Sequence, residues 1–175
     1  MLHLILGGAR SGKSRLAEQT AEKSDLPVIY IATAQARDEE MRQRIAYHQQ
    51  QRPAHWQLVE QPIFLADQLL KSDHPNQIIL VDCLTLWLSN LLIAEDVNLQ
   101  QQQIEQLFAV LPQLQSDIIL VSNETGLGVV PMGELSRRFV DEAGRVHQSL
   151  GQLAHKVVFC VAGFPMILKD EPSHD

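Results

Sequence analysis

The sequence has few cysteines, no surplus of positive charge and no long uninterrupted apolar run, and each absence excludes a class of protein. Its two cysteines, Cys83 and Cys160, lie far apart in apolar segments, so we expect reduced core thiols and neither a disulfide nor a metal site. The formal net charge of -7 at pH 7 argues against non-specific binding to nucleic acid or to an anionic membrane. Without a run of about 18 apolar residues, no membrane-spanning helix is predicted.

Targeting features are also missing at the N-terminus. The chain enters an apolar run at Leu2, without the basic region and cleavage site of a signal peptide, which predicts a cytoplasmic protein. No internal repeat or linker divides the 175 residues. We therefore expect one catalytic domain over residues 1–170, followed by a loose tail over residues 171–175.

What the sequence does contain is a phosphate-binding loop directly after the first apolar run. Residues 7–14 have the spacing G-x-x-x-x-G-K-S, which joins a strand to a helix in nucleotide-binding proteins. Glycines allow backbone N–H groups to approach an anionic triphosphate closely. Lys13 is predicted to place its charge on the β- and γ-phosphates, while Ser14 binds Mg²⁺ and the helix N-terminus adds its dipole. The loop predicts a nucleoside triphosphate site.

Short apolar runs alternate with helical segments along the whole chain. Strands are expected at residues 2–6, 27–33, 56–60, 77–82, 117–122 and 156–163, and helices at residues 14–23, 38–51, 63–71, 83–95, 98–115 and 134–153. This order predicts a single-domain α/β P-loop fold of the RecA-like type, with a mostly parallel central sheet and helices on both faces. The strongly apolar helix at 83–95 is expected either in the core or at a subunit contact.

Polar residues at the ends of the predicted strands are further candidates for the site. One strand ends in Asp82, where phosphate-loop proteins place a carboxylate that holds Mg²⁺. Another is followed by Asn123 and Glu124. These two residues either orient the attacking hydroxyl or a metal-bound water, or form a capped turn in which Asn123 bonds its own backbone.

Further motifs occur in an order and spacing that resemble one family. Besides the phosphate loop, they are Ile31-Ala32-Thr33, Asp38-Glu39-Glu40-Met41, Arg44-Ile45 with His48, and the stretches at 52–56, 122–131 and 141–146. Together they resemble the bifunctional adenosylcobinamide kinase / adenosylcobinamide-phosphate guanylyltransferase family of cobalamin biosynthesis, over residues 4–169. The resemblance implies that ATP or GTP phosphorylates adenosylcobinamide. GMP is then transferred from GTP, which gives adenosylcobinamide-GDP and pyrophosphate.

The resemblance also implies roles for individual residues. His48 matches the histidine that is guanylylated in the family, a role that suits a neutral imidazole nitrogen. Members often carry a second histidine just before it, where this chain has Tyr47. Glu60 is a candidate reader of the guanine edge. The matched nucleotide-contact positions are Gly7, Gly8, Ala9, Arg10, Ser11, Gly12, Lys13, Ser14, Ala32, Thr33, Ala34, Gln49, Gln50, Gln51, Arg52, Glu60 and Asp82.

The same resemblance implies partners and leaves alternatives open. It implies Mg²⁺ at Ser14 and Asp82, a corrinoid and nucleoside triphosphates as substrates, and a homo-oligomer, commonly a trimer. Arg137, Arg138 and Arg145 either meet the corrinoid phosphate or face water. From the residues alone, a solvated helix residue is the favoured interpretation of His48, because isolated surface histidines are common, and the family pattern reverses that preference. The competing functions are a small-molecule kinase without guanylyltransferase activity, and a RecA-like nucleotide-dependent switch module.

Overall fold

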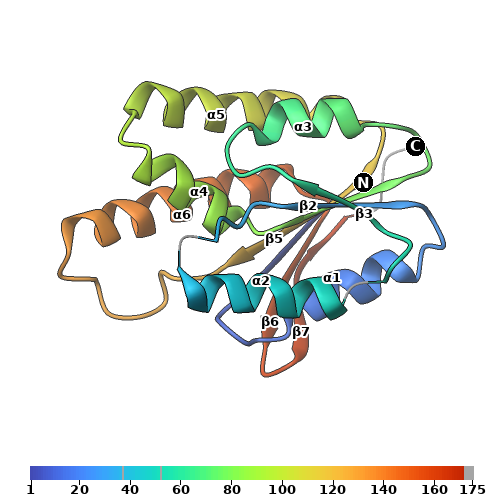
Figure 1. The fold of residues 1–175 in the computed structure, drawn as a ribbon, viewed down its shortest axis with the longest axis horizontal. Helices are drawn as coiled ribbons and strands as arrows, with labels where there is room; N and C mark the ends of the chain where they lie inside the picture. Colours follow the sequence, from blue (N-terminus) through green and yellow to red (C-terminus); the bar gives the residue numbers. More distant parts are fainter. Residues whose placement is uncertain (37, 52, 172–175) are drawn as a thin grey trace.

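The computed structural model describes residues 1–36, 38–51 and 53–171, without the side chains of residues 44 and 47–51. Within these residues, seven strands form one sheet in the order β3-β2-β4-β5-β1-β6-β7 (Figure 1). Neighbouring strands are parallel except β6 and β7. The strands are β1 Leu2–Gly7, β2 Val28–Ala32, β3 Gln57–Glu60, β4 Ile78–Asp82, β5 Asp117–Asn123, β6 Lys156–Val161 and β7 Phe164–Asp170.

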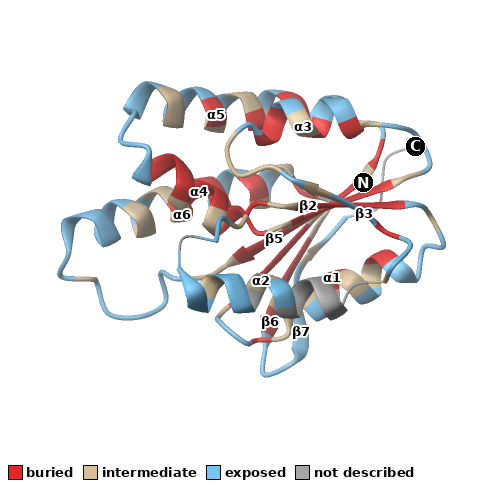
Figure 2. Cartoon of the chain, viewed as in Figure 1, coloured by how far each residue is buried: buried red, intermediate tan, exposed pale blue. Residues whose placement is uncertain are grey.

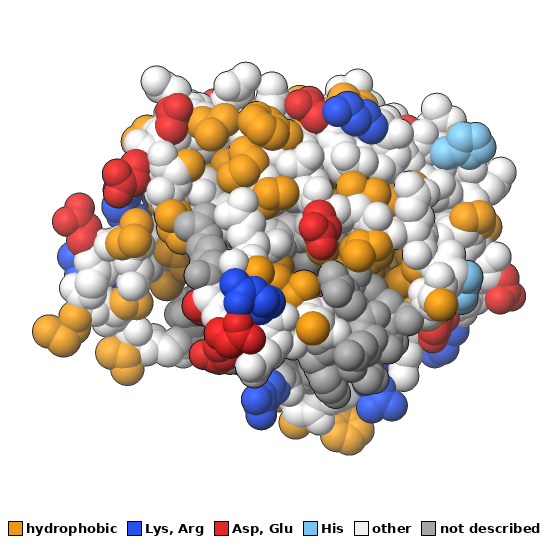
Figure 3. Space-filling model, viewed as in Figure 1, with side chains coloured by type: hydrophobic (Ala, Val, Ile, Leu, Met, Phe, Trp, Pro, Cys, Tyr) orange, Lys and Arg blue, Asp and Glu red, His pale blue; other side chains and the backbone are white. Residues whose placement is uncertain are grey.

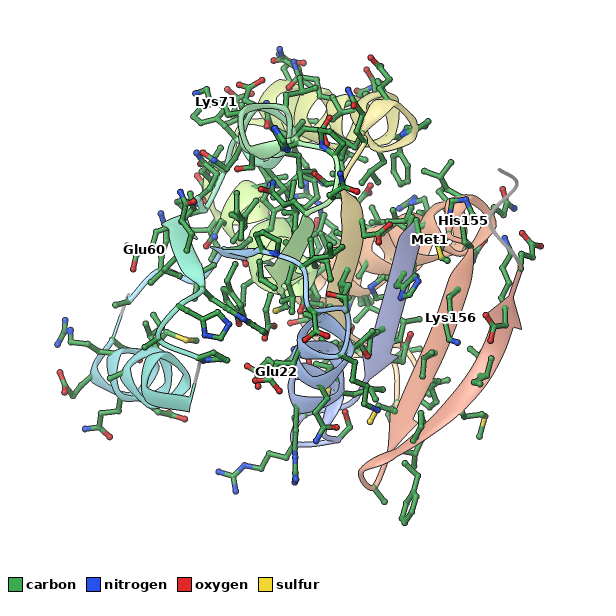
Figure 4. All side chains as sticks on the ribbon, turned by 90° about the vertical axis from the view of Figure 1, so that its right-hand side faces the viewer. Met1, Glu22, Glu60, Lys71, His155 and Lys156 are labelled. Carbon is green, nitrogen blue, oxygen red and sulfur yellow. The ribbon has the colours of Figure 1, made fainter. Side chains whose placement is uncertain are left out.

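Helices cover both faces of this sheet, as the sequence predicts. They are α1 Lys13–Glu22, α2 Glu39–Gln51, α3 Leu65–Ser72, α4 Leu84–Ile93, α5 Val97–Val110 and α6 Glu134–Leu153. Ala17 and Ala21 of α1 pack with Ile5 and Tyr30 on one face. Buried residues of α3, α4, α5 and α6 pack on the other face. Helix α2 lies on the α1 side of the sheet, near β3 (Figures 1 and 4). The α/β fold class is confirmed.

The central strands are buried on both faces, which explains why they are apolar at successive positions (Figure 2). Both cysteines are free thiols in this interior, so the prediction of reduced core thiols is confirmed. Burial, and to a smaller extent the neighbouring Asp82 carboxylate, raise the pKa of Cys83 to about 11. The Cys83 thiol is therefore protonated and unreactive at neutral pH.

The apolar helix α4 belongs to the core of this chain. Leu84, Trp87, Leu88 and Leu91 are each no more than 1% exposed. The core interpretation of this helix is therefore confirmed, while Ile93 at its C-terminal end is 47% exposed and a subunit contact through the helix stays a prediction. Among the described residues, no helix is both long enough and apolar enough to cross a bilayer.

Two boundaries differ from the predictions. Strand β6 ends at Val161, and the chain turns at Ala162 and Gly163 into β7, an antiparallel edge strand that was not predicted. Helix α5 ends at Val110, before a 3-10 turn over Leu111–Gln113, where the predicted helix ran on to residue 115. Pro112 explains this early end, because proline lacks the N–H that would continue the helical ladder.

Candidate active site

The phosphate loop joins β1 to α1 at the carboxyl edge of the sheet. Its backbone is left-handed at Arg10, with φ of 55°, and at Gly12, with φ of 93°. The N–H of Ser11 donates to Gly8 O at 3.2 Å, and α1 begins directly at Lys13. The loop therefore turns tightly against the helix N-terminus, where free N–H groups favour an anion.

Lys13 lies inside this loop. Its side chain is only 8% exposed, and Nζ donates to Gly8 O at 3.1 Å. An ammonium held against one carbonyl of the loop retains two further donors for phosphate oxygens. Lys13 therefore lies inside the loop, and its contact with the β- and γ-phosphates stays a prediction.

The turn between β6 and β7 is hydrogen-bonded to the phosphate loop. Ser11 O accepts hydrogen bonds from Gly163 N at 2.8 Å and from Cys160 Sγ at 3.1 Å. A Cβ atom on Gly12 would lie 3.2 Å from Gly163 Cα. The hairpin that sequence reasoning missed therefore fixes the middle of the phosphate loop.

Gly7→Ala is expected to lower the free energy of unfolding of the nucleotide-free protein by about 1–3 kcal/mol, the usual cost of overpacking. An added Cβ would lie 2.5 Å from Ser11 Oγ and 2.7 Å from the backbone oxygen of Cys160. Gly8→Ala is the matched control, since a Cβ there would meet nothing within 4 Å. Urea unfolding measures both variants, and equal midpoints would contradict the prediction.

Asp82 ends β4 and is anchored by an aromatic side chain from β2. The Tyr30 hydroxyl donates to Asp82 Oδ2 at 3.0 Å, and the Tyr30 ring stacks on Trp56 with centroids 6.4 Å apart.

The predicted nucleotide contacts at residues 32–34 differ in burial. Ala32 and Ala34 are half-buried. The Thr33 side chain, however, is fully buried, and its hydroxyl donates to Cys83 O and accepts the Cys83 N–H. Its side chain ties β2 to β4.

Strand β5 lies between β1 and β4, so its end lies between the phosphate loop and Asp82. Glu124 follows this strand, and its N–H donates to Gly7 O at 3.0 Å. Its Oε1 accepts from the Gly126 N–H, while Oδ1 of Asn123 is buried without a hydrogen-bond partner among the described residues. The alternative in which Asn123 caps this turn is therefore wrong, because the Glu124 side chain caps it.

His147 is a site neighbour that sequence reasoning missed. It projects from α6, is 8% exposed, and places Nε2 2.7 Å from Ser122 Oγ and Nδ1 3.7 Å from Glu124 Oε2. Burial lowers its pKa below 6.5, and the Glu124 carboxylate opposes that shift. The sequence did carry a signal that His147 is buried. It lies on the helix face that also carries Ala143, Val146 and Leu150, where an apolar residue is usual.

Other predicted residues lie elsewhere or outside the described parts. Glu60 is exposed at the end of β3, and Figure 4 shows it at the sheet edge opposite to Lys156. Four strand spacings separate β3 from β1, which is about 19 Å. Positions 48–51 belong to α2, but the side chains of His48, Gln49, Gln50 and Gln51, with Tyr47 beside them, lie outside the described residues, as does the whole of Arg52.

Two arginines of α6 have partners within the protein, and Arg145 Nη2 lies 3.7 Å from Glu142 Oε2. Arg137 donates through Nη1 to the carbonyls of Pro131 and Met132 in the β5–α6 loop. Arg138 and Arg145 line a cavity of about 480 Å³ between α5 and α6, beside Asp141 and Glu142.

The loop between β5 and α6 exposes apolar residues. Figure 3 shows hydrophobic side chains gathered at the left end of the molecule, where this loop lies, and the loop's Val129 and Met132 are almost fully exposed.

The candidate metal ligands are oxygen atoms, the Asp82 carboxylate and the Ser14 hydroxyl. Among the described residues, no group of three or more His, Cys, Asp and Glu side chains could hold a metal ion. Mg²⁺ prefers oxygen ligands, and it commonly uses one or two protein groups together with substrate phosphates and water. The residues present therefore fit Mg²⁺ brought in with a nucleotide.

Comparisons with known proteins identify the family. The family model described as cobinamide kinase / cobinamide phosphate guanyltransferase matches residues 3–168. The bifunctional adenosylcobalamin biosynthesis protein CobP of Pseudomonas aeruginosa is 58% identical over 172 residues, which cover 98% of this chain and 99% of that protein. The protein of the same description named CobU, from Escherichia coli K12, is 40% identical over 183 residues and is covered completely, with 97% of this chain.

A solved structure from Pyrococcus horikoshii OT3 has a similar fold. Its TM-score is 0.58 at 9% identity, and the match covers 98% of this chain and 87% of that one. At that identity the likeness concerns the fold alone. The family model and the two bacterial relatives carry the assignment: the chain belongs to the cobinamide kinase / cobinamide phosphate guanyltransferase family and is an enzyme of that family.

Proposed function

We propose that the chain performs both reactions of its family at overlapping nucleotide sites. ATP or GTP first phosphorylates adenosylcobinamide, and GMP from GTP is then transferred through guanylylated His48 to give adenosylcobinamide-GDP. The observation that carries the proposal is the phosphate loop with Lys13 buried inside it, flanked by Glu124, in a chain that matches the family from residue 3 to 168.

In the kinase step, the chain binds the triphosphate and orients the acceptor. Backbone N–H groups of the loop and Lys13 hold the β- and γ-phosphates, and Lys13 neutralises charge that develops during transfer. Glu124 accepts a hydrogen bond from the corrinoid hydroxyl and so aims it at the γ-phosphorus. Ser14 and Asp82 hold Mg²⁺, which neutralises phosphate charge when bound. Ala9, Arg10 and the backbone at residues 32–34 complete the nucleotide contacts.

In the guanylyltransferase step, a nitrogen of His48 attacks the α-phosphorus of GTP. The bond from that phosphorus to the bridging oxygen breaks, and pyrophosphate leaves. An oxygen of adenosylcobinamide phosphate then attacks the same phosphorus, and the N–P bond breaks to return the free imidazole. Helix α2, which carries position 48, and Glu60 at the end of β3 occupy the same side of the molecule (Figure 4), which supports Glu60 as the guanine reader.

Incubation with GTP labelled at the α-phosphate tests this proposal. The label is expected on His48 as an acid-labile, base-stable adduct found by peptide mapping, and His48→Ala is expected to abolish it while γ-phosphoryl transfer persists. His55→Ala is the matched control, because His55 is exposed and its ring packs edge-on against Trp56. If the unmodified protein takes up no label but still transfers the γ-phosphoryl group, it is a kinase without guanylyltransferase activity. If it shows neither activity, the switch module is favoured.

We also propose a homo-oligomer, with a trimer favoured, acting in the cytoplasm where ATP and GTP are available. Exposed apolar residues of the unpredicted edge strand support a subunit contact there, namely Phe164, Met166, Ile167 and Leu168. Sedimentation equilibrium measures the assembly, and a monomer at micromolar concentration would contradict this proposal.

A further inference from the structure

The Glu124 carboxylate is held from two sides by groups of the protein. Its Oε1 accepts the Gly126 N–H, and its Oε2 faces Nδ1 of His147 at 3.7 Å. The side chain of Glu124 is 22% exposed and that of His147 is 8% exposed. Glu124 is thus partly accessible to solvent, while its partner imidazole stays inside the fold.

The second nitrogen of the imidazole fixes its orientation. His147 Nε2 lies 2.7 Å from Ser122 Oγ, and Ser122 is completely buried in β5. A lone pair on Nδ1 would repel the Glu124 carboxylate, so the neutral ring carries its proton on Nδ1 and accepts the Ser122 hydroxyl at Nε2. This tautomer makes a directed chain from Ser122 through His147 to Glu124.

The orientation of Glu124 matters because of where its backbone is attached. The Glu124 N–H donates to Gly7 O, so the residue is tied to the first residue of the phosphate loop. In the role proposed for it, this carboxylate meets the hydroxyl that attacks the γ-phosphorus, and small displacements of such a group are costly.

We propose that His147 is a positioning residue for phosphoryl transfer: from α6 it holds the Glu124 carboxylate beside the phosphate loop, in the orientation that receives the acceptor hydroxyl. This inference rests on the role proposed for Glu124 in the kinase step. It does not depend on the guanylylation of His48.

A pair of substitutions at position 147 tests the role of the Nδ1 donor. The amide nitrogen of asparagine can occupy the place of Nδ1, whereas that of glutamine reaches one bond farther, toward Ser122. His147→Asn is expected to keep kcat for phosphoryl transfer from ATP within about threefold, and His147→Gln to lower it about tenfold with KM for ATP unchanged. A merely structural histidine would make the two variants equally impaired, with matching losses of melting temperature.

A second pair of substitutions approaches the carboxylate without touching the buried ring. A Cβ on Gly126 would lie 3.0 Å from Glu124 Oε1, whereas a Cβ on Gly128 would meet nothing within 4 Å. Gly126→Ala is expected to lower kcat about threefold to tenfold, while Gly128→Ala leaves it unchanged. Equal activity of these two loop variants would overturn the inference.

A double-substitution cycle shows whether His147 acts through Glu124. Glu124→Gln is expected to lower kcat at least tenfold, and adding His147→Gln is expected to cost no more than about twofold beyond that. Fully additive losses, or a fully active Glu124→Gln, would overturn the positioning role. Labelling of His48 by GTP in the same variants reports separately on the proposed guanylyltransferase step, so failure of one proposal is distinguished from failure of the other.

Discussion

Lys13→Met is expected to lower the rate of γ-phosphoryl transfer about 10³-fold, which corresponds to about 4 kcal/mol of lost transition-state stabilisation. Methionine has a similar length and no charge, so a side chain still packs inside the loop but the ammonium is lost. Because Lys13 is 8% exposed and held by Gly8 O, no solvated cation takes its place. Steady-state kinetics with ATP and adenosylcobinamide measures the loss, which is expected in kcat more than in KM.

Lys23→Met is the matched control for this substitution. Lys23 is an exposed residue at the C-terminus of α1, so the same change in net charge occurs on the same helix outside the loop. Its kcat is expected within about twofold of the unmodified protein. A Lys13→Met variant that retained more than a tenth of the original rate would show that the phosphates are held without this ammonium.

The phosphate loop and the strands beside it were predictable because their sequence signals are local. A glycine-rich loop between a buried strand and a helix needs only adjacent residues to specify it. Asp82 was predictable because it ends a strand, and ligands of open α/β sheets bind at the carboxyl ends of the strands. The expected start of a helix at residue 38 agrees with α2, where Asp38 Oδ1 accepts the Met41 N–H at 2.7 Å as an N-cap. In each case the residues that interact are close together in the chain.

The support behind the site could not be predicted, because its partners are distant in sequence. Gly163 bonds Ser11 only after β6 has paired with β1, and nothing near either residue signals that contact. The partnership of His147 with Glu124 likewise depends on how α6 packs across the end of β5. A histidine among apolar positions indicates burial, but the group that faces it is known only from the tertiary structure.

Trp87→Ala is expected to lower the free energy of unfolding by about 3–5 kcal/mol, the range for removing a large buried aromatic side chain. The Trp87 side chain is fully buried in α4, and its Nε1 donates to Ile63 O at 2.7 Å. A domain of this size has about 5–15 kcal/mol of stability in total, so the variant would approach the limit of folding. Urea unfolding followed by far-UV circular dichroism measures the change.

Two further variants separate the apolar contact from the hydrogen bond. Trp87→Phe keeps most of the apolar contact and removes only the indole donor, while Ile63 O still accepts the Leu65 N–H at 3.0 Å, so a smaller loss of about 1 kcal/mol is expected. Leu70→Ala, at a position that is 50% exposed on α3, is expected to change stability by less than about 0.5 kcal/mol. If Trp87→Ala cost no more than Leu70→Ala, α4 would not be the core helix that its burial indicates, and its apolar surface would again need another partner.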